Sequence, residues 1–254
     1  VYILGERPEF FISEFVFTFF AKIRRKPLII WSGAINKEIL TINREKNFFN
    51  RLIYLASYYF IDFYKRILFK LADSFVVYGV AAKRFIQNYQ IKEEIIFAGT
   101  QIMPEKSLFG PSIKINTKKS KNQKIILSLG YLRKDKGLQY LINAFNKLNK
   151  KNVFLWIVGD GDYKKELKKI VRGNKNIKFF AYAEGIKKAN FYSLADFFVF
   201  PTLNDCWGLV INESLYYGVP VISTNKAGAS ELIENGKTGI IISDRDVPAL
   251  VKSM

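Results

Sequence analysis

Two carboxylates mark one loop-to-helix passage of the sequence, NDCWGLVINESLYYGVPVIST. Asp205 and Glu213 have seven residues between them, and in a fully helical passage they would lie roughly 12 Å apart along the axis. The first helical amides, those of Gly208, Leu209 and Val210, are free to meet an anion. The pattern fits an extended ligand with phosphates in the middle and hydroxyl groups at its ends, because carboxylates accept hydrogen bonds from vicinal diols. The plainer alternative is that both acids merely suit a surface helix.

A basic loop in SLGYLRKDKGLQYLINAF is the second candidate. A continuously apolar run ends at Gly130, and Arg133, Lys134 and Lys136 follow before a helical pattern that begins at Leu138. Loops after the strands of open α/β sheets commonly bind ligands, and clustered cations there suit a diphosphate. A solvated turn in a basic protein explains the same residues equally well.

Other residues that carry chemistry point away from metal, thiol and dinucleotide sites. VGDGDY lacks the third glycine of a dinucleotide fingerprint, so Asp160 and Asp162 are expected to shape the turn and to cap the next helix. The chain has no histidine, the commonest general base and zinc ligand. The single cysteine, Cys206, is expected to be a half-buried packing residue. This cysteine usage favours a reducing, cytoplasmic setting.

The elements that position these residues alternate along the chain. Apolar runs read as buried strands, and amphipathic helical stretches lie between most of them, which predicts an α/β fold with parallel sheets. The runs are VYILGER at the start, then PLIIWSG, SFVVYG and EEIIFAG, and later KIILSLG, VFLWIVG, IKFFAYA, FFVFPT, VPVIST and TGIII. Because the first run lacks an initiator methionine and DVPALVKSM reads as a helix just starting, the chain is interpreted as a fragment cut at both ends.

The domain organisation follows from a linker signature. Residues 105–123 contain prolines, glycine and several lysines without a helical period, so they are predicted to join two domains. The first, residues 1–104, shows too few strands for a complete domain. The second, residues 124–254, carries all the candidate site residues.

The charge balance favours anionic partners. Lysine and arginine total 40 against 22 aspartate and glutamate residues, a net charge of +18, which suits polyanions, phosphorylated ligands or an anionic membrane surface. Nucleic acid is not the expected partner, because the lysines are scattered and no reading motif appears. The stretch SEFVFTFFAKIRRK would suit a membrane surface, although packing against its own sheet is favoured.

A family resemblance joins these motifs. FVFPTLNDCWGLVINESLYYGVPVIST, SLGYLRKDKGLQYLINAF, VFLWIVGDGDYKKELK and AGASELIENGKTGII together resemble the C-terminal domain of retaining glycosyltransferases of family 4, which have the two-domain GT-B fold. The likeness covers nearly everything from Lys124 onward. LADSFVVYGVAAKRFI resembles, less sharply, the last part of the family's acceptor domain. The fold implied is GT-B, with two Rossmann-like domains of which the N-terminal one is incomplete.

The resemblance implies a role for each candidate residue. Glu213 matches the glutamate that holds the ribose, and Asp205 stands where the family has a glutamate that contacts the donor sugar. Lys136 matches the lysine that binds the phosphates, and Arg133 is expected to assist it, since Tyr131 occupies the family's arginine position. Asp205, Lys136 and Arg133 are therefore the expected catalytic residues. The expected donor-binding residues are Glu213, Gly208, Leu209, Val210, Gly130 and Tyr182, the last within the segment that meets the nucleobase.

The implied reaction transfers a sugar from a nucleotide-diphosphate donor to a glycan, a lipid-linked molecule or another hydroxyl acceptor, with retained anomeric configuration. Neither a metal nor a cofactor is expected, because positive side chains and a helix N-terminus can stabilise the departing diphosphate. The expected location is the cytoplasm, including peripheral contact with the cytoplasmic face of an anionic membrane. Two alternatives stay open: a non-catalytic relative that binds nucleotide sugars, and a basic nucleic-acid-binding protein.

Overall fold

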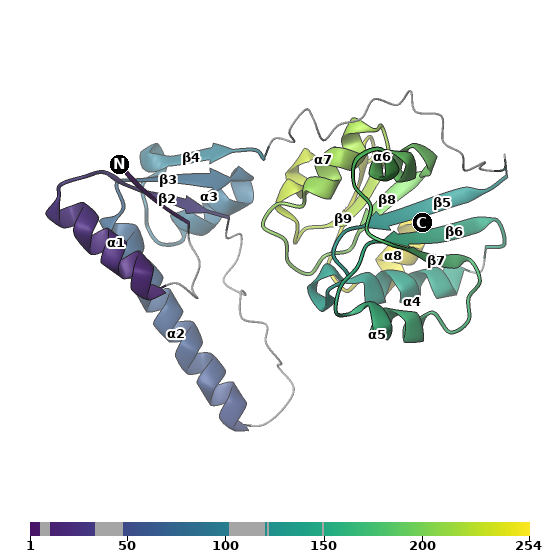
Figure 1. Ribbon diagram of the computed structural model, residues 1–254, viewed down its shortest axis with the longest axis horizontal. Coiled ribbons are helices and arrows are strands. Elements are labelled where there is room, and N and C mark those ends of the chain that lie inside the picture. Colours follow the sequence, from purple (N-terminus) through teal and green to yellow (C-terminus); the bar gives the residue numbers. More distant parts are fainter. Residues whose placement is uncertain (6–10, 34–47, 102–119, 121, 149) are drawn as a thin grey trace. The chain divides into compact units, whose positions relative to one another are not determined.

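The computed structural model describes residues 1–5, 11–33, 48–101, 120, 122–148 and 150–254. They form two compact units, Val1–Thr100 and Gln101–Met254, and each unit contains its own parallel sheet (Figure 1). The α/β prediction is thereby confirmed. The predicted linker over residues 105–123 lies outside the described residues, apart from residues 120, 122 and 123.

The first unit has a four-stranded sheet in the order β1-β2-β3-β4. Its strands are β1 (Tyr2–Gly5), β2 (Leu28–Ser32), β3 (Ser74–Tyr78) and β4 (Ile96–Gly99), and its helices are α1 (Phe11–Ile23), α2 (Phe48–Leu71) and α3 (Gly79–Gln87). The strand expected from Glu93 begins three residues later, because Glu93–Ile95 form a 3-10 turn. Glutamate is a poor strand former, and Glu93 instead pairs with Lys83 on α3.

Helix α1 packs within its unit, but four of its phenylalanines take no part in that packing. The residues it buries are Glu14, Thr18 and Ala21. The Glu14 carboxylate accepts a hydrogen bond of 2.7 Å from the Tyr64 hydroxyl of α2. Its phenylalanines at 15, 17, 19 and 20 are all exposed. Within the described residues, no helix is both long and apolar enough to cross a bilayer.

The second unit has a six-stranded sheet in the order β10-β9-β8-β5-β6-β7. The strands are β5 (Lys124–Leu129), β6 (Val153–Val158), β7 (Ile177–Phe180), β8 (Phe197–Phe200), β9 (Val221–Thr224) and β10 (Gly239–Ile242). The helices are α4 (Leu138–Leu148), α5 (Lys164–Ile170), α6 (Gly185–Leu194), α7 (Leu209–Tyr216) and α8 (Val247–Ser253). Figure 1 shows α4 and α5 on one face of this sheet and α6 and α7 on the other, which explains why its strands are continuously apolar.

The order of the strands reverses beside β5. From β5 the chain builds outward to β6 and β7, and then returns to the other side of β5 to build β8, β9 and β10. In open α/β sheets, ligands bind in the crevice at the carboxyl ends of the strands flanking such a switch point.

Strands β5 and β8, which flank the switch point, are paired over only a short length. Strands β5 and β6 share six register pairs, whereas β5 and β8 share two, Ile126 with Phe197 and Leu127 with Phe198. One step further on, the Ser128 hydroxyl bridges the strands with a 2.8 Å hydrogen bond to the Val199 carbonyl. Beyond it the two strands lead into separate loops, and a cavity lies between these loops.

Candidate functional site

A cavity of about 230 Å³ opens at the carboxyl edge of β5 and β8. Among the residues predicted from the sequence, six line it: Gly130, Lys136, Asp205, Gly208, Leu209 and Val210. They come from the loop after β5, the turn before α4 and the passage that leads into α7. The two motifs singled out in the sequence therefore form one site.

The passage into α7 is shaped by one glycine. Gly208 has φ 93°, a left-handed conformation, and a Cβ placed on it would lie 2.8 Å from Cε1 of Phe200. Helix α7 begins at the next residue, Leu209, within a residue or two of the predicted start. Its first amides have no partner within the helix, and the residues that carry them line the cavity.

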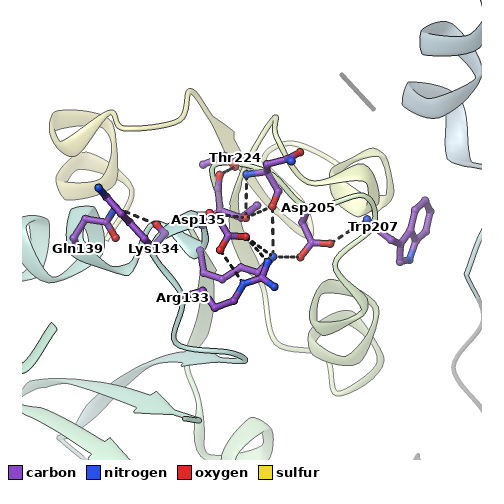
Figure 2. Close-up of polar contacts among 10 residues, drawn as sticks. Arg133, Lys134, Asp135, Gln139, Asp205, Trp207 and Thr224 are labelled. Carbon is purple, nitrogen blue, oxygen red and sulfur yellow. Dashed lines mark hydrogen bonds and ion pairs between the residues drawn. The ribbon is translucent and has the colours of Figure 1, made fainter. Parts of the chain in front are cut away.

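Lys136 and Asp205 form an ion pair in the wall of the cavity. Lys136 Nζ lies 2.7 Å from Asp205 Oδ2, and the two side chains are 14% and 19% exposed. The other carboxylate oxygen, Oδ1, accepts a hydrogen bond of 3.1 Å from the backbone N–H of Trp207 (Figure 2). Both oxygens of Asp205 are thus engaged within the protein.

The backbone on either side of this pair is fixed. The Asp205 N–H donates to the Lys226 carbonyl at 3.0 Å, and the Asp205 carbonyl accepts from the Gly228 N–H at 3.1 Å. On the lysine side, Gly137 has φ 69°, and a Cβ there would collide with the Pro201 carbonyl. The loop before α4 and the loop after β8 are therefore locked together.

Arg133 does not belong to the cavity wall. Its guanidinium donates two hydrogen bonds to Asp135, of 2.9 Å from Nε and 2.6 Å from a terminal nitrogen, and Asp135 also lies 3.3 Å from Lys136 Nζ (Figure 2). Burial acts to raise the pKa of Asp135, but the hydrogen bond from Arg133 and the charge of Lys136 outweigh it and hold this pKa below its usual value. Arg133 would have to leave Asp135 to reach a diphosphate.

Glu213 faces α6 rather than the cavity. Its carboxylate lies 2.6 Å from Lys188 Nζ and accepts a 2.9 Å hydrogen bond from the Tyr192 hydroxyl. The Glu213 side chain is 12% exposed. Burial, followed by the nearby Glu213 carboxylate, raises the pKa of the fully buried Tyr192 well above its usual value.

Sequence reasoning missed Lys188 and Tyr192. Their spacing of four places them on one face of α6, and this is the only local signal that they carry.

Tyr182 follows β7, two strands away from β5. Its ring is exposed and its hydroxyl is 3.4 Å from Glu184, so the structure does not bring it into the cavity wall.

Two smaller expectations were wrong. Cys206 is exposed and lines the cavity, because the residue stands between the fixed Asp205 and the buried Trp207 in the mouth of the site. Asp160 and Asp162 do not cap α5, whose cap residue, Tyr163, makes no side-chain capping bond. Asp160 accepts from the Gly161 N–H at 2.9 Å, as expected of a turn residue.

Among the described residues, no group of three or more histidine, cysteine or acidic side chains could hold a metal ion.

Residues 111–254 match the family model of glycosyl transferases group 1. The chain belongs to this family. A sulfoquinovosyl transferase of Arabidopsis thaliana is 28% identical over 133 residues, which are 51% of this chain and 26% of the relative. The capsular polysaccharide biosynthesis glycosyltransferase CapM of Staphylococcus aureus is 30% identical over 136 residues, 51% of this chain and 35% of CapM. The chain therefore spans about a quarter to a third of these two relatives.

Solved structures extend the likeness to the whole chain. HepE of Anabaena, in complex with UDP and glucose, superimposes with a TM-score of 0.67 at 18% identity, over 98% of this chain and 66% of HepE. WaaG, a glycosyltransferase involved in lipopolysaccharide biosynthesis, gives a TM-score of 0.68 at 18% identity, over 95% of this chain and 71% of WaaG. The predicted GT-B fold is confirmed.

Proposed function

We propose that the protein is a retaining glycosyltransferase that uses a nucleotide-diphosphate sugar as its donor and a hydroxyl group of a glycan or lipid-linked molecule as its acceptor. The observation that carries this proposal is the position of Lys136, in the wall of a cavity at the switch point of a parallel sheet and beside the start of α7. The UDP and glucose held by HepE support a nucleotide sugar as the donor. The capsular polysaccharide role of CapM supports a glycan product.

The cavity offers a cation and backbone donors to a diphosphate. Lys136 supplies a mobile ammonium group, and the first amides of α7 supply hydrogen bonds and the positive end of the helix dipole. Gly130, which has φ 146° and would have no atom within 4 Å of an added Cβ, leaves the mouth open on the side of β5. These groups stabilise the charge that develops on a departing diphosphate without requiring a metal.

Glu213 is assigned to the ribose. Its carboxylate lies on α7 and is partly exposed, and a carboxylate accepts hydrogen bonds from both hydroxyls of a vicinal diol. Lys188 forms an ion pair with this carboxylate, so ribose binding would replace or share that ion pair. Tyr182 is assigned to the nucleobase because its exposed ring lies at the same edge of the sheet.

Peripheral contact with the cytoplasmic face of an anionic membrane is a second part of the proposal. The exposed phenylalanines of α1 are followed at once by Arg24, Arg25 and Lys26, a combination typical of helices that lie on anionic lipid. Sedimentation with vesicles tests this part. The protein should pellet with phosphatidylglycerol vesicles and not with phosphatidylcholine vesicles, and equal behaviour with both would refute it.

Calorimetry with UDP, GDP and ADP, each compared with its nucleoside, tests the main proposal. At least one diphosphate should bind, and Lys136→Ala should weaken it far more than it weakens the nucleoside. Lys164→Ala is the matched control, because Lys164 also pairs with an aspartate, at 3.3 Å, but lies on α5. If Lys136→Ala weakens diphosphate and nucleoside equally, the lysine only supports the fold.

A further inference from the structure

We propose that Asp205 is the internal counter-ion of Lys136, with which the diphosphate of a bound nucleotide must compete, rather than a contact to the donor sugar. The inference rests on the proposed function and concerns the same cavity. It gives Asp205 a different role from the one that the resemblance implies.

The geometry leaves Asp205 little capacity for a sugar. Oδ2 is taken by Lys136 at 2.7 Å, and Oδ1 is taken by the Trp207 N–H at 3.1 Å. The bonds of its main chain to residues 226 and 228 prevent the backbone from advancing into the cavity. Because a single methylene separates the Asp205 carboxylate from the backbone, the side chain alone is too short to extend further into the cavity.

The charges of the neighbouring groups cancel in pairs. Arg133 is bound in bidentate fashion by Asp135, and Lys136 is bound by Asp205, so these two cations face two carboxylates. A diphosphate that approaches Lys136 meets an ammonium group that is already neutralised. Its affinity is therefore lower than the lysine alone would provide.

Lysine is the member of the pair that can move. Its ammonium group sits on a flexible four-carbon stem, whereas Asp205 is fixed by its backbone. We expect Lys136 Nζ to turn from Asp205 toward the phosphates when a nucleotide binds, and to return when the product leaves. The counter-ion thus weakens the hold on the nucleoside diphosphate product and favours its release.

Asp205→Asn tests the inference in the 254-residue chain. Asparagine has nearly the same shape and its Oδ1 can still accept from Trp207, but the substitution removes the nearer of the two carboxylate charges beside Lys136, the other being Asp135 at 3.3 Å. Calorimetry with the tightest of UDP, GDP and ADP should show binding strengthened by roughly ten-fold. In the Lys136→Ala background the same substitution should change the affinity little, because the counter-ion acts through that lysine.

Asp196→Asn is the matched control. Asp196 has the same 19% side-chain exposure as Asp205 and likewise pairs with a lysine, Lys124, at 3.1 Å, while its second oxygen accepts from the Ile125 N–H at 2.7 Å. It lies before β8, at the opposite edge of the sheet, so its substitution should leave nucleotide affinity unchanged.

Each outcome decides between the inference and the proposed function. Weaker or unchanged diphosphate binding by Asp205→Asn would overturn the counter-ion role, and unchanged diphosphate binding together with weaker nucleotide-sugar binding would restore the sugar contact. Strengthening that persists without Lys136 would also overturn it. If neither the native chain nor Asp205→Asn binds any diphosphate, the proposed function fails and the inference falls with it.

Discussion

Glu213, the residue proposed to bind the ribose, is held by two side chains of α6. Its two neighbours on α6 differ in what they offer: Lys188 neutralises the charge at 2.6 Å, and Tyr192, fully buried, donates a hydrogen bond at 2.9 Å. Tyrosine therefore fixes the orientation of the carboxylate, and under the proposed function lysine is the partner that a ribose would displace. The Glu213 carboxylate is thus held by an ion pair and a hydrogen bond from the same helix.

Glu213→Gln should weaken nucleoside diphosphate binding by about 1.5–3 kcal/mol, because a charged acceptor is lost from the ribose. The loss should shrink when a 2′-deoxynucleotide is used, since one of the two hydroxyls is then already absent. Calorimetry measures both values. Glu234→Gln is the control for charge, because Glu234 pairs with Lys237 on the surface. A Glu213→Gln variant that binds nucleotide as tightly as the native chain would refute the ribose role.

Local signals in the sequence indicated which residues share the cavity wall, while the roles of these residues stay predictions. Asp205, Lys136 and Gly208 stand in short motifs in which a strand end, a glycine and a charge follow one another, and such motifs indicate a site at a sheet edge. Lys188 was missed because its partner Glu213 is 25 residues away on a different helix. Arg133 was expected at the phosphates, but Asp135, two residues on, captures it. Pairing between side chains of one loop depends on backbone geometry that spacing does not reveal.

At the level of elements, the start of α7 depends on a residue without a side chain. Gly208→Ala should destabilise the second unit by about 1–3 kcal/mol, because it adds left-handed strain and drives a methyl group into the Phe200 ring. It should also weaken nucleotide binding, since the ring and the helix start form the cavity wall. Gly236→Ala separates the two effects: Gly236 has φ 82° but would have no atom within 4 Å of an added Cβ. Thermal unfolding and calorimetry of both variants give the comparison.

In both units, an aspartate that precedes one strand accepts a hydrogen bond from the backbone of the neighbouring strand. Asp73 precedes β3 and accepts from the Leu28 N–H at 2.7 Å, as Asp196 before β8 accepts from the Ile125 N–H. The hydrogen bond from Leu28, opposed by partial burial and helped by Lys22, lowers the pKa of Asp73 below its usual value near 3.8.

Because the pKa of Asp73 is lower in the folded state, its stabilisation is complete above the unfolded value and is lost as the pH falls through the folded value. Asp73→Asn should therefore destabilise the first unit near neutral pH and flatten the loss of stability below about pH 4. Thermal unfolding from about pH 2.5 to about pH 6 measures this dependence. If the loss of stability at acid pH were the same in Asp73→Asn as in the native chain, other carboxylates would be responsible for that loss.

At the scale of the whole molecule, the two units differ in how fully their sheets are covered. Trp31, Val76 and Phe97, which lie side by side across β2, β3 and β4, are 46%, 37% and 60% exposed. The central strands of the second unit bury nearly all their side chains; in β5, every residue after Lys124 is buried. Parallel sheets are normally covered on both faces, so less apolar area stabilises the first unit.

Hydrogen exchange should accordingly show faster opening in β2 and β3 than in β5 and β6, because local stability follows buried apolar contacts. Mass spectrometry of exchanged peptides from the 254-residue chain measures it. Uniform protection across both sheets would mean that the first unit obtains its stability from another source.

The positions of the strands and the coverage of the sheets could be predicted further than the orientation of side chains. Continuous apolar runs predicted the parallel strands of both sheets, because a strand whose sheet is covered on both faces buries its side chains on both sides. The outward aromatic face of α1 was the less favoured of two predictions, since a helix rich in phenylalanine ordinarily turns that face inward. Instead α1 buries Glu14, Thr18 and Ala21, and Glu14 accepts a hydrogen bond from Tyr64 of α2.

The brief pairing of β5 with β8 has a consequence for the order in which the protein folds. The bridge between Ser128 and Val199 joins residues 71 positions apart, whereas β5 with β6 and β8 with β9 are joined by much shorter connections. Closing a long loop for a few hydrogen bonds is entropically unfavourable, so this seam should form after the two halves of the sheet it unites. The cavity proposed to bind the nucleotide opens at that seam, and ligand binding should therefore be the last property to return during refolding.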